Sequence, residues 1–139
     1  MFKQILVPVD LTDAHGRALD IAAMLSAQSG GQITLLHVVE LIAGLSPEEG
    51  KDFYSRLEKK ARDHLGRLAA QLTSRKAAVR TEVIFGNRAV EVVRYAQQQA
   101  TELIVLTSHR IDPHQGIASL GTLSHRVGIL APCPVLLMK

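Results

Sequence analysis

Asp10 and the segment that begins at Gly121 carry the side chains of this sequence that are best suited to binding a ligand. Asp10 directly follows an apolar run, Phe2–Val9. A carboxylate at the end of a buried strand can accept hydrogen bonds from a ribose or from an adenine edge. The same carboxylate could instead cap the following helix together with Thr12 and Asp13, because such short polar side chains are preferred at helix N-termini. The sequence leaves both roles open.

The segment Gly121-Thr122-Leu123-Ser124 opens the last helix that the sequence predicts. The first N–H groups of a helix have no partners within it and attract anions, and here the glycine permits close approach while Thr122 and Ser124 add hydroxyl groups. This combination predicts an anion site. The alternative is purely local: Gly121 relaxes a turn and Thr122 caps the helix.

The signatures of catalytic and metal centres are missing from the sequence. There is no nucleophile elbow, no phosphate-binding Gly-Lys-Ser loop and no glycine-rich dinucleotide fingerprint. Cys133 lies between two prolines at the start of a predicted strand, where burial is expected rather than nucleophilic use. No catalytic residue, no metal site and no dedicated enzyme are therefore predicted. The histidines lack the spacing of metal ligands supported by a carboxylate or a cysteine; they are His15, His37, His64, His109, His114 and His125.

Five apolar and β-branched runs predict the strands that position these groups. Amphipathic helices are predicted between them: Thr12 would cap the first, and Ser46-Pro47-Glu48-Glu49 has the cap, proline and acidic residue typical of a helix start. The strands are predicted at Phe2–Val9, Gln32–Val39, Val79–Phe85, Leu103–Leu106 and Val135–Met138, and the last helix at Gly121–Leu130. The core-facing positions would be Ala18, Ile21, Ala22 and Leu25, then Phe53, Leu57, Ala61, Leu65, Leu68 and Leu72, then Ala89, Val92, Val93 and Ala96.

Strict alternation of strands and helices predicts an α/β fold, a doubly wound five-stranded parallel sheet with helices on both faces. In such a sheet, ligands bind beyond the carboxyl ends of the strands, where the winding direction reverses. The rule selects Pro8-Val9-Asp10, His37-Val38-Val39, Gly86 and Thr107-Ser108-His109-Arg110 as the place of a site. It does not identify the chemistry.

Composition narrows the class of protein. The 139 residues, 47% of them hydrophobic, suit one domain over residues 1–139. The net charge of +3 is spread over interleaved acidic and basic side chains, and with 4% aromatic residues and no Trp the chain is not expected to bind nucleic acid. Its apolar runs are too short to span a bilayer, and the layout of the first residues does not predict a signal peptide. A single cysteine is consistent with the cytoplasm.

Three segments taken in order resemble the universal stress protein family: Ile5–Asp10, Leu35–Val39, and Leu120–Val127 running into Ala131–Leu137. The resemblance extends over the whole chain and includes Gly86 after the third strand. It implies a fold like that of the adenine nucleotide alpha hydrolases, with strand order 3-2-1-4-5. It also implies an adenosine site at Pro8, Val9, Asp10 and Val38.

The phosphate side departs from the pattern of the nucleotide-binding branch of that family. This branch has Gly-x-x-Gly after the fourth strand, then nine residues, then Gly-Ser or Gly-Thr. Gly121-Thr122 supplies the second half, but Thr107 and Arg110 stand at the two glycine positions, and ten residues, 111–120, follow Arg110. A β-branched Thr107 lacks the backbone freedom of glycine. Arg110 could grip a phosphate or fill its place. The nucleotide contacts that the resemblance implies are completed by Ser108, Leu123 and Ser124.

Two functions follow from the resemblance. The first is a stress-response sensor or switch that binds ATP or AMP, with Mg²⁺ accompanying ATP and with slow hydrolysis at most. The alternative is a stress scaffold that needs no nucleotide and acts through protein partners. Either form would be a homodimer, because Val135, Leu136 and Leu137 would form an apolar edge strand without proline or charge, and such an edge favours pairing with its copy.

Overall fold

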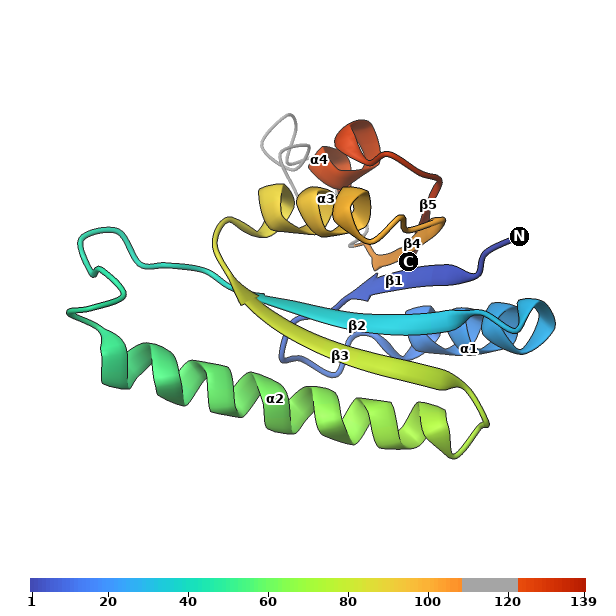
Figure 1. Cartoon of the computed structure of the whole chain (residues 1–139), viewed down its shortest axis with the longest axis horizontal. Helices are drawn as coiled ribbons and strands as arrows, with labels where there is room; N and C mark the ends of the chain where they lie inside the picture. The colour runs from blue at the N-terminus through green and yellow to red at the C-terminus, as the bar shows by residue number, and fades with distance from the viewer. Residues whose placement is uncertain (109–122) are drawn as a thin grey trace.

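The computed structural model of the chain describes residues 1–108 and 123–139. In these residues, strands and helices alternate as the sequence predicts (Figure 1). The strands are β1 (Gln4–Pro8), β2 (Gln32–Val39), β3 (Ala78–Phe85), β4 (Leu103–Thr107) and β5 (Val135–Met138). The helices are α1 (Gly16–Ser29), α2 (Lys51–Thr73), α3 (Arg88–Gln98) and α4 (Leu123–Leu130).

The strands form one parallel sheet in the order β3-β2-β1-β4-β5, which confirms the predicted topology. The sheet does not end evenly. Pairing between β1 and β2 stops at Pro8 with Leu36, whereas β2 stays paired with β3 as far as Val39 with Phe85. The last residues of β2 therefore extend beyond the end of β1.

Helices cover both faces of the sheet, with α1 and α2 on one side and α3 and α4 on the other (Figure 1). Apolar side chains alternate along each strand, so each face has its own core. Ile5, Val7 and Leu35 pack with α1 and α2. Leu6, Leu36 and Leu106 pack instead with α3 and α4, and Val92 and Val127 from those helices are fully buried.

The first helix begins later than Thr12, so the predicted cap is wrong. The Thr12 hydroxyl donates to Asp10 Oδ1 at 2.5 Å and accepts from the Ala14 N–H at 3.3 Å. These bonds hold a turn, and α1 begins at Gly16 with His15 as the residue before it. The Thr12 oxygen that was expected to cap the helix thus accepts within this turn instead.

The second helix also begins later, at Lys51. Ser46 caps only a single turn, in which its Oγ accepts from the Glu49 N–H at 3.1 Å. The hydroxyl of Tyr54, in the first turn of α2, ties the helix to the loop before Ser46, because it donates to the Leu45 carbonyl at 2.8 Å and accepts from the Ile42 N–H at 2.9 Å. Tyr54 is buried for this reason, while Phe53, which was predicted to face the core, is 40% exposed.

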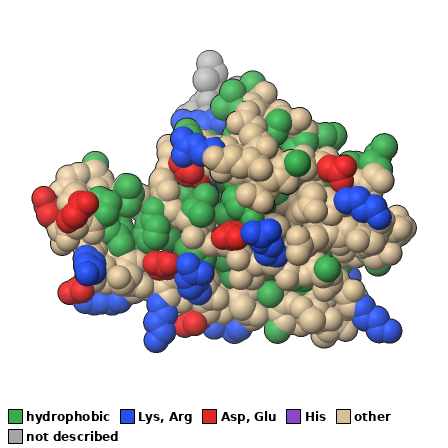
Figure 2. Space-filling model, in the orientation of Figure 1, with side chains coloured by type: hydrophobic (Ala, Val, Ile, Leu, Met, Phe, Trp, Pro, Cys, Tyr) green, Lys and Arg blue, Asp and Glu red, His purple; other side chains and the backbone are tan. Residues whose placement is uncertain are grey.

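The remaining differences are small. On α3, Tyr95 is buried where Val93 was expected, and Val93 is half-buried. Asn87 caps this helix through its side-chain oxygen, which accepts from the Val90 N–H at 3.1 Å. On the surface shown in Figure 2, charges of both signs are interspersed along α2, and apolar side chains gather where the β2–α2 connection projects. The exposed apolar residues of that region include Leu41, Ile42, Phe53 and Phe85.

Candidate functional site

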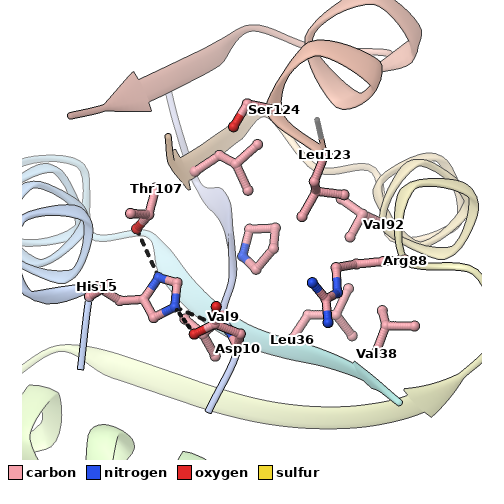
Figure 3. A pocket seen from close by; sticks show the side chains of 13 residues that line it. Val9, Asp10, His15, Leu36, Val38, Arg88, Val92, Thr107, Leu123 and Ser124 are labelled. Carbon is pink, nitrogen blue, oxygen red and sulfur yellow. Dashed lines mark hydrogen bonds and ion pairs between the residues drawn. The ribbon is translucent and has the colours of Figure 1, made fainter. Parts of the chain in front are cut away.

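A cavity of about 200 Å³ lies beyond the carboxyl ends of β1, β2 and β4 (Figure 3). The starts of α3 and α4 complete its wall. This is the place that the rule for doubly wound sheets selects. Most of the described residues that the sequence nominated line it: Pro8, Val9, Asp10, Val38, Thr107, Leu123 and Ser124.

Ser108 is a described residue that does not line the cavity. Its N–H donates to the Met138 carbonyl at 2.7 Å, and its Oγ accepts from Lys139 Nζ at 3.3 Å. Ser108 therefore faces β5, whereas Thr107 before it faces the cavity, because consecutive residues of a strand point to opposite sides. Arg110, Gly121 and Thr122 lie outside the described residues, so their predicted contacts stay predictions.

Six further described residues line the cavity although the sequence did not predict them as site residues, and the polar ones among them are His15 and Arg88. His15 gave a weak signal, because a histidine five positions after Asp10 falls just before the first helix. Arg88 follows the cap residue Asn87 at the first position of α3, where topology brings it over the end of β2. The additional lining residues are Ala14, His15, Leu36, Arg88, Val92 and Leu106.

His15 joins the ends of two strands that are far apart in the sequence. Its Nε2 lies 2.7 Å from Asp10 Oδ1, and its Nδ1 lies 2.8 Å from Thr107 Oγ1 (Figure 3). The imidazole itself is buried, with 7% of the residue exposed. A carboxylate can only accept, so Nε2 carries the hydrogen given to Asp10. The Asp10 N–H, 3.1 Å from the same nitrogen, therefore makes no second hydrogen bond to it.

Asp10 is held in its ionised form. Partial burial acts to raise the pKa of this carboxyl, but hydrogen bonds from the Thr12 side chain, His15 and the Thr12 N–H outweigh burial. Together they hold the pKa well below its usual range. All three donors reach Oδ1. A ligand hydroxyl would therefore find its acceptor at Oδ2.

The backbone of Val38 faces the cavity. The Leu36 carbonyl accepts from the Val9 N–H on the β1 side at 2.9 Å, and the Val39 carbonyl accepts from the Gly86 N–H on the β3 side at 3.0 Å. Backbone groups alternate along a strand, so those of Val38 point to the β1 side, where β1 has already ended.

The next acceptor along that edge is already occupied. The Val9 carbonyl, which would continue the ladder to Val38, accepts from His37 Nδ1 at 2.8 Å. Burial lowers the pKa of His37 despite this bond, so the imidazole is a neutral donor. Among the described residues, the Val38 N–H is not given to the Val9 carbonyl. The Val38 N–H and C=O thus form an adjacent donor and acceptor at the cavity wall.

Apolar side chains and one guanidinium complete the cavity next to Val38. Leu36 and Val92 are fully buried there. Figure 3 shows the Arg88 side chain extending from α3 toward Leu36. Arg88 Nε is 3.8 Å from Glu40 Oε1, and both side chains are about half exposed. Such a long, solvated contact leaves the guanidinium able to meet an anionic ligand.

The described residues contain no group of three or more histidine, cysteine or acidic side chains that could hold a metal ion. Nor do they include a helix with the length and apolar character needed to cross a bilayer. Burial raises the pKa of the Cys133 thiol, which keeps it protonated and weakly nucleophilic.

The model of the universal stress protein family matches residues 1–139. The chain belongs to this family. Among curated relatives, the universal stress protein YxiE of Bacillus subtilis (strain 168) is 29% identical over 150 residues, and the alignment covers 100% of both proteins. The predicted family resemblance is thus confirmed over the full length of the domain.

Solved structures of universal stress proteins have the same fold. The universal stress protein UspA from Lactobacillus plantarum aligns with a TM-score of 0.82 at 25% identity, over 99% of this chain and 98% of that one. The universal stress protein from Archaeoglobus fulgidus, solved in complex with dAMP, aligns with a TM-score of 0.73 at 19% identity over 100% of both chains. These likenesses show the fold that this chain shares with them.

Proposed function

We propose that this universal stress protein binds an adenine nucleotide, AMP or ATP, and acts as a sensor or switch rather than as an enzyme. The observation that carries the proposal is the open backbone edge of Val38 in the same cavity as the Asp10 carboxylate. The dAMP complex of the Archaeoglobus fulgidus relative supports the ligand class.

The donor and acceptor of Val38 suit adenine. Adenine presents N1, an acceptor, beside the N6 amino group, a donor. The Val38 N–H would donate to N1, and the Val38 carbonyl would accept from the amino group. The apolar side chains of Leu36 and Val92 would cover the faces of the ring, since purine rings bury well against such surfaces.

The ribose and phosphate would extend toward Asp10 and α4. Asp10 Oδ2 would accept from a ribose hydroxyl, because Oδ1 is already taken. The phosphate would lie near Ser124 and the start of α4, where helix N–H groups favour anions. Arg110, Gly121 and Thr122 would add to this side, with Mg²⁺ accompanying ATP. We expect at most slow hydrolysis of bound ATP from this arrangement.

Calorimetric titration with AMP, ADP and ATP tests the proposal. We expect binding by the native chain, and we expect Asp10→Ala to weaken it by roughly 1–2 kcal/mol, the scale of a hydrogen bond to a charged group. Asp63→Ala, which removes an exposed carboxylate from α2, is the matched control and should leave binding unchanged. Absence of heat and of a melting shift at millimolar nucleotide would favour the alternative, a cytoplasmic scaffold that acts through protein partners.

We further propose that the protein is a homodimer paired through β5. This strand lies at the edge of the sheet, and Leu136 and Leu137 are 37% and 39% exposed. Ile129 and Leu130 of the neighbouring α4 are 69% and 58% exposed. A second copy whose β5 runs antiparallel would satisfy the free backbone groups and cover these side chains.

Light scattering on Leu137→Pro tests the dimer. The carbonyls of Pro134 and Met138 accept from the N–H groups of Ile104 and Ser108, so along β5 the backbone groups of Leu136 face β4 and those of Leu137 face the open edge. Proline at position 137 removes an outward donor, so the variant should be a monomer that keeps most of its fold. Thr81→Pro on β3, the opposite edge strand, is the control: it removes an outward donor in the same way but should leave the dimer intact. A monomeric native chain, or a dimeric Leu137→Pro protein, would mean that β5 is not the interface.

A further inference from the structure

His15 has a hydrogen-bond partner on each ring nitrogen, and the direction of the bond at Nδ1 depends on a single proton. Nε2 donates to Asp10 Oδ1 at 2.7 Å in either state, because the carboxylate only accepts. Nδ1, 2.8 Å from Thr107 Oγ1, accepts when the imidazole is neutral and donates when it is protonated. The protonation state of His15 therefore decides whether the Thr107 hydroxyl donates to Nδ1 or accepts from it.

Thr107 lines the cavity, so a ligand meets the part of the hydroxyl that is not bonded to His15. With neutral His15, the Thr107 hydroxyl gives its hydrogen to Nδ1 and offers only lone pairs to the cavity. With protonated His15, Oγ1 accepts from Nδ1, and its own hydrogen is free to point at the ligand. The first state suits a group that donates, and the second suits an anionic oxygen.

We infer that His15 is a specificity-determining residue that couples an anionic ligand group to proton uptake. A nucleoside monophosphate would bind with one proton added at His15 Nδ1, and its oxygen would accept the freed Thr107 hydrogen. An uncharged nucleoside would bind without a change in protonation. The inference rests on the proposed nucleotide function, which it deepens by naming what regulates the phosphate side of the site.

The charges around His15 allow the protonated state. Asp10 holds the imidazolium on one side, and the incoming anion adds a second negative charge. From α2, the side chains that meet His15 in a shallow surface cavity are Leu68 and Gln71, which carry no charge. Among residues 1–108 and 123–139, the charged groups in the two cavities that His15 lines are Asp10 and Asp13, which would attract an imidazolium, and Arg88, which would repel it. His37 lies behind the Val9 carbonyl as a neutral donor.

Titration calorimetry of the native chain in two buffers of different protonation enthalpy, slightly above neutral pH, measures the proton uptake. The probes are AMP, adenosine 5′-sulfate and adenosine. The sulfate ester carries an anion that does not titrate, so its uptake cannot come from the ligand. We expect roughly one proton per site with the sulfate and with AMP, and close to none with adenosine.

Three variants separate this role from a structural one, once circular dichroism shows that each is folded. His15→Asn should bind the sulfate without proton uptake. Thr107→Val keeps the shape but removes the hydroxyl, and should lose the uptake and bind the sulfate about tenfold more weakly. Thr107→Ser should retain both. Equal uptake by native and His15→Asn proteins, or binding of the sulfate without uptake by the native chain, overturns the inference alone. Absence of heat with all three probes overturns the proposed function as well.

Discussion

At one end of the cavity three polar side chains are joined by hydrogen bonds, whereas at the other end apolar side chains surround the backbone N–H and C=O of one strand residue. The polar end consists of Asp10, which follows β1, His15, which precedes α1, and Thr107, which ends β4. The apolar end consists of Leu36, Val38 and Val92, from β2 and α3. The polar end is organised by internal hydrogen bonds before any ligand arrives. The apolar end is organised by packing.

The two ends should therefore respond differently to change. Packing fixes the apolar end so firmly that a ligand must match its backbone, since neither the strand nor the buried side chains can shift without loss of stability. The polar end can change the direction of its hydrogen bonds with little movement of atoms. Ligand discrimination is expected to be strict at the apolar end and dependent on protonation at the polar end.

Replacing AMP with IMP should produce the largest effect, and at the apolar end. IMP carries O6 and N1–H where AMP carries an amino group and a bare N1, so both positions oppose the Val38 groups. The mismatch should weaken binding by roughly 2–3 kcal/mol, or about a hundredfold. Competition titration against AMP measures it. Equal affinity for IMP and AMP would mean that the backbone of Val38 does not contact the base.

Val92→Ala should reduce stability more than it reduces binding. The side chain is fully buried, and the loss of two methyl groups should lower the free energy of unfolding by about 2 kcal/mol. The hydrogen bonds of the polar end do not involve it. Urea unfolding of this variant is compared with that of Val90→Ala, where the side chain on the same helix is 48% exposed. If the two substitutions cost the same, packing does not organise the apolar end.

Acid should selectively weaken the polar end through Asp10. The folded-state pKa of this carboxyl is depressed, so its contribution to stability is present above the unfolded pKa, about 3.9. That contribution is lost as the pH falls from there toward the folded-state value. Urea midpoints of the native chain should thus fall more steeply below pH 4 than those of Asp10→Asn, with Asp63→Asn as the control. Parallel curves for the native chain and Asp10→Asn would contradict the ionised Asp10 described above.

Topology and the place of the site could be predicted because they depend on patterns that local sequence carries. Alternating apolar strands and amphipathic helices define the parallel sheet, and a carboxylate just after β1 must lie at its carboxyl edge. Strand and helix boundaries were less predictable where side chains compete for partners. The Thr12 oxygen accepts from the Ala14 N–H in a turn instead of capping α1. The Tyr54 hydroxyl bonds to the Leu45 carbonyl before Ser46, and α2 begins at Lys51.

The contents of the polar end could not be predicted, because they depend on contacts between distant segments. Nothing local links His15 to Thr107, which lies 92 positions away. The sequence marked Thr107 by its place after the fourth strand and as a residue standing where the family pattern has glycine, whereas the only signal from His15 was its spacing from Asp10. Arg88 was missed for the same reason, since only the crossing of α3 over β2 brings it to the cavity.

Glu40→Gln should have the smallest effect, and it concerns the charge at the rim of the apolar end. The Arg88–Glu40 contact is long and solvated, so its loss should change the free energy of unfolding by less than about 0.5 kcal/mol. The substitution nevertheless frees Arg88 from its counter-charge and removes a negative charge beside the cavity. AMP should therefore bind about two- to threefold more tightly, whereas adenosine should be unaffected. Because such solvated charges are screened by salt, the gain should vanish at about 1 M NaCl. Equal gains for AMP and adenosine would show that Arg88 contacts the base and not an anion.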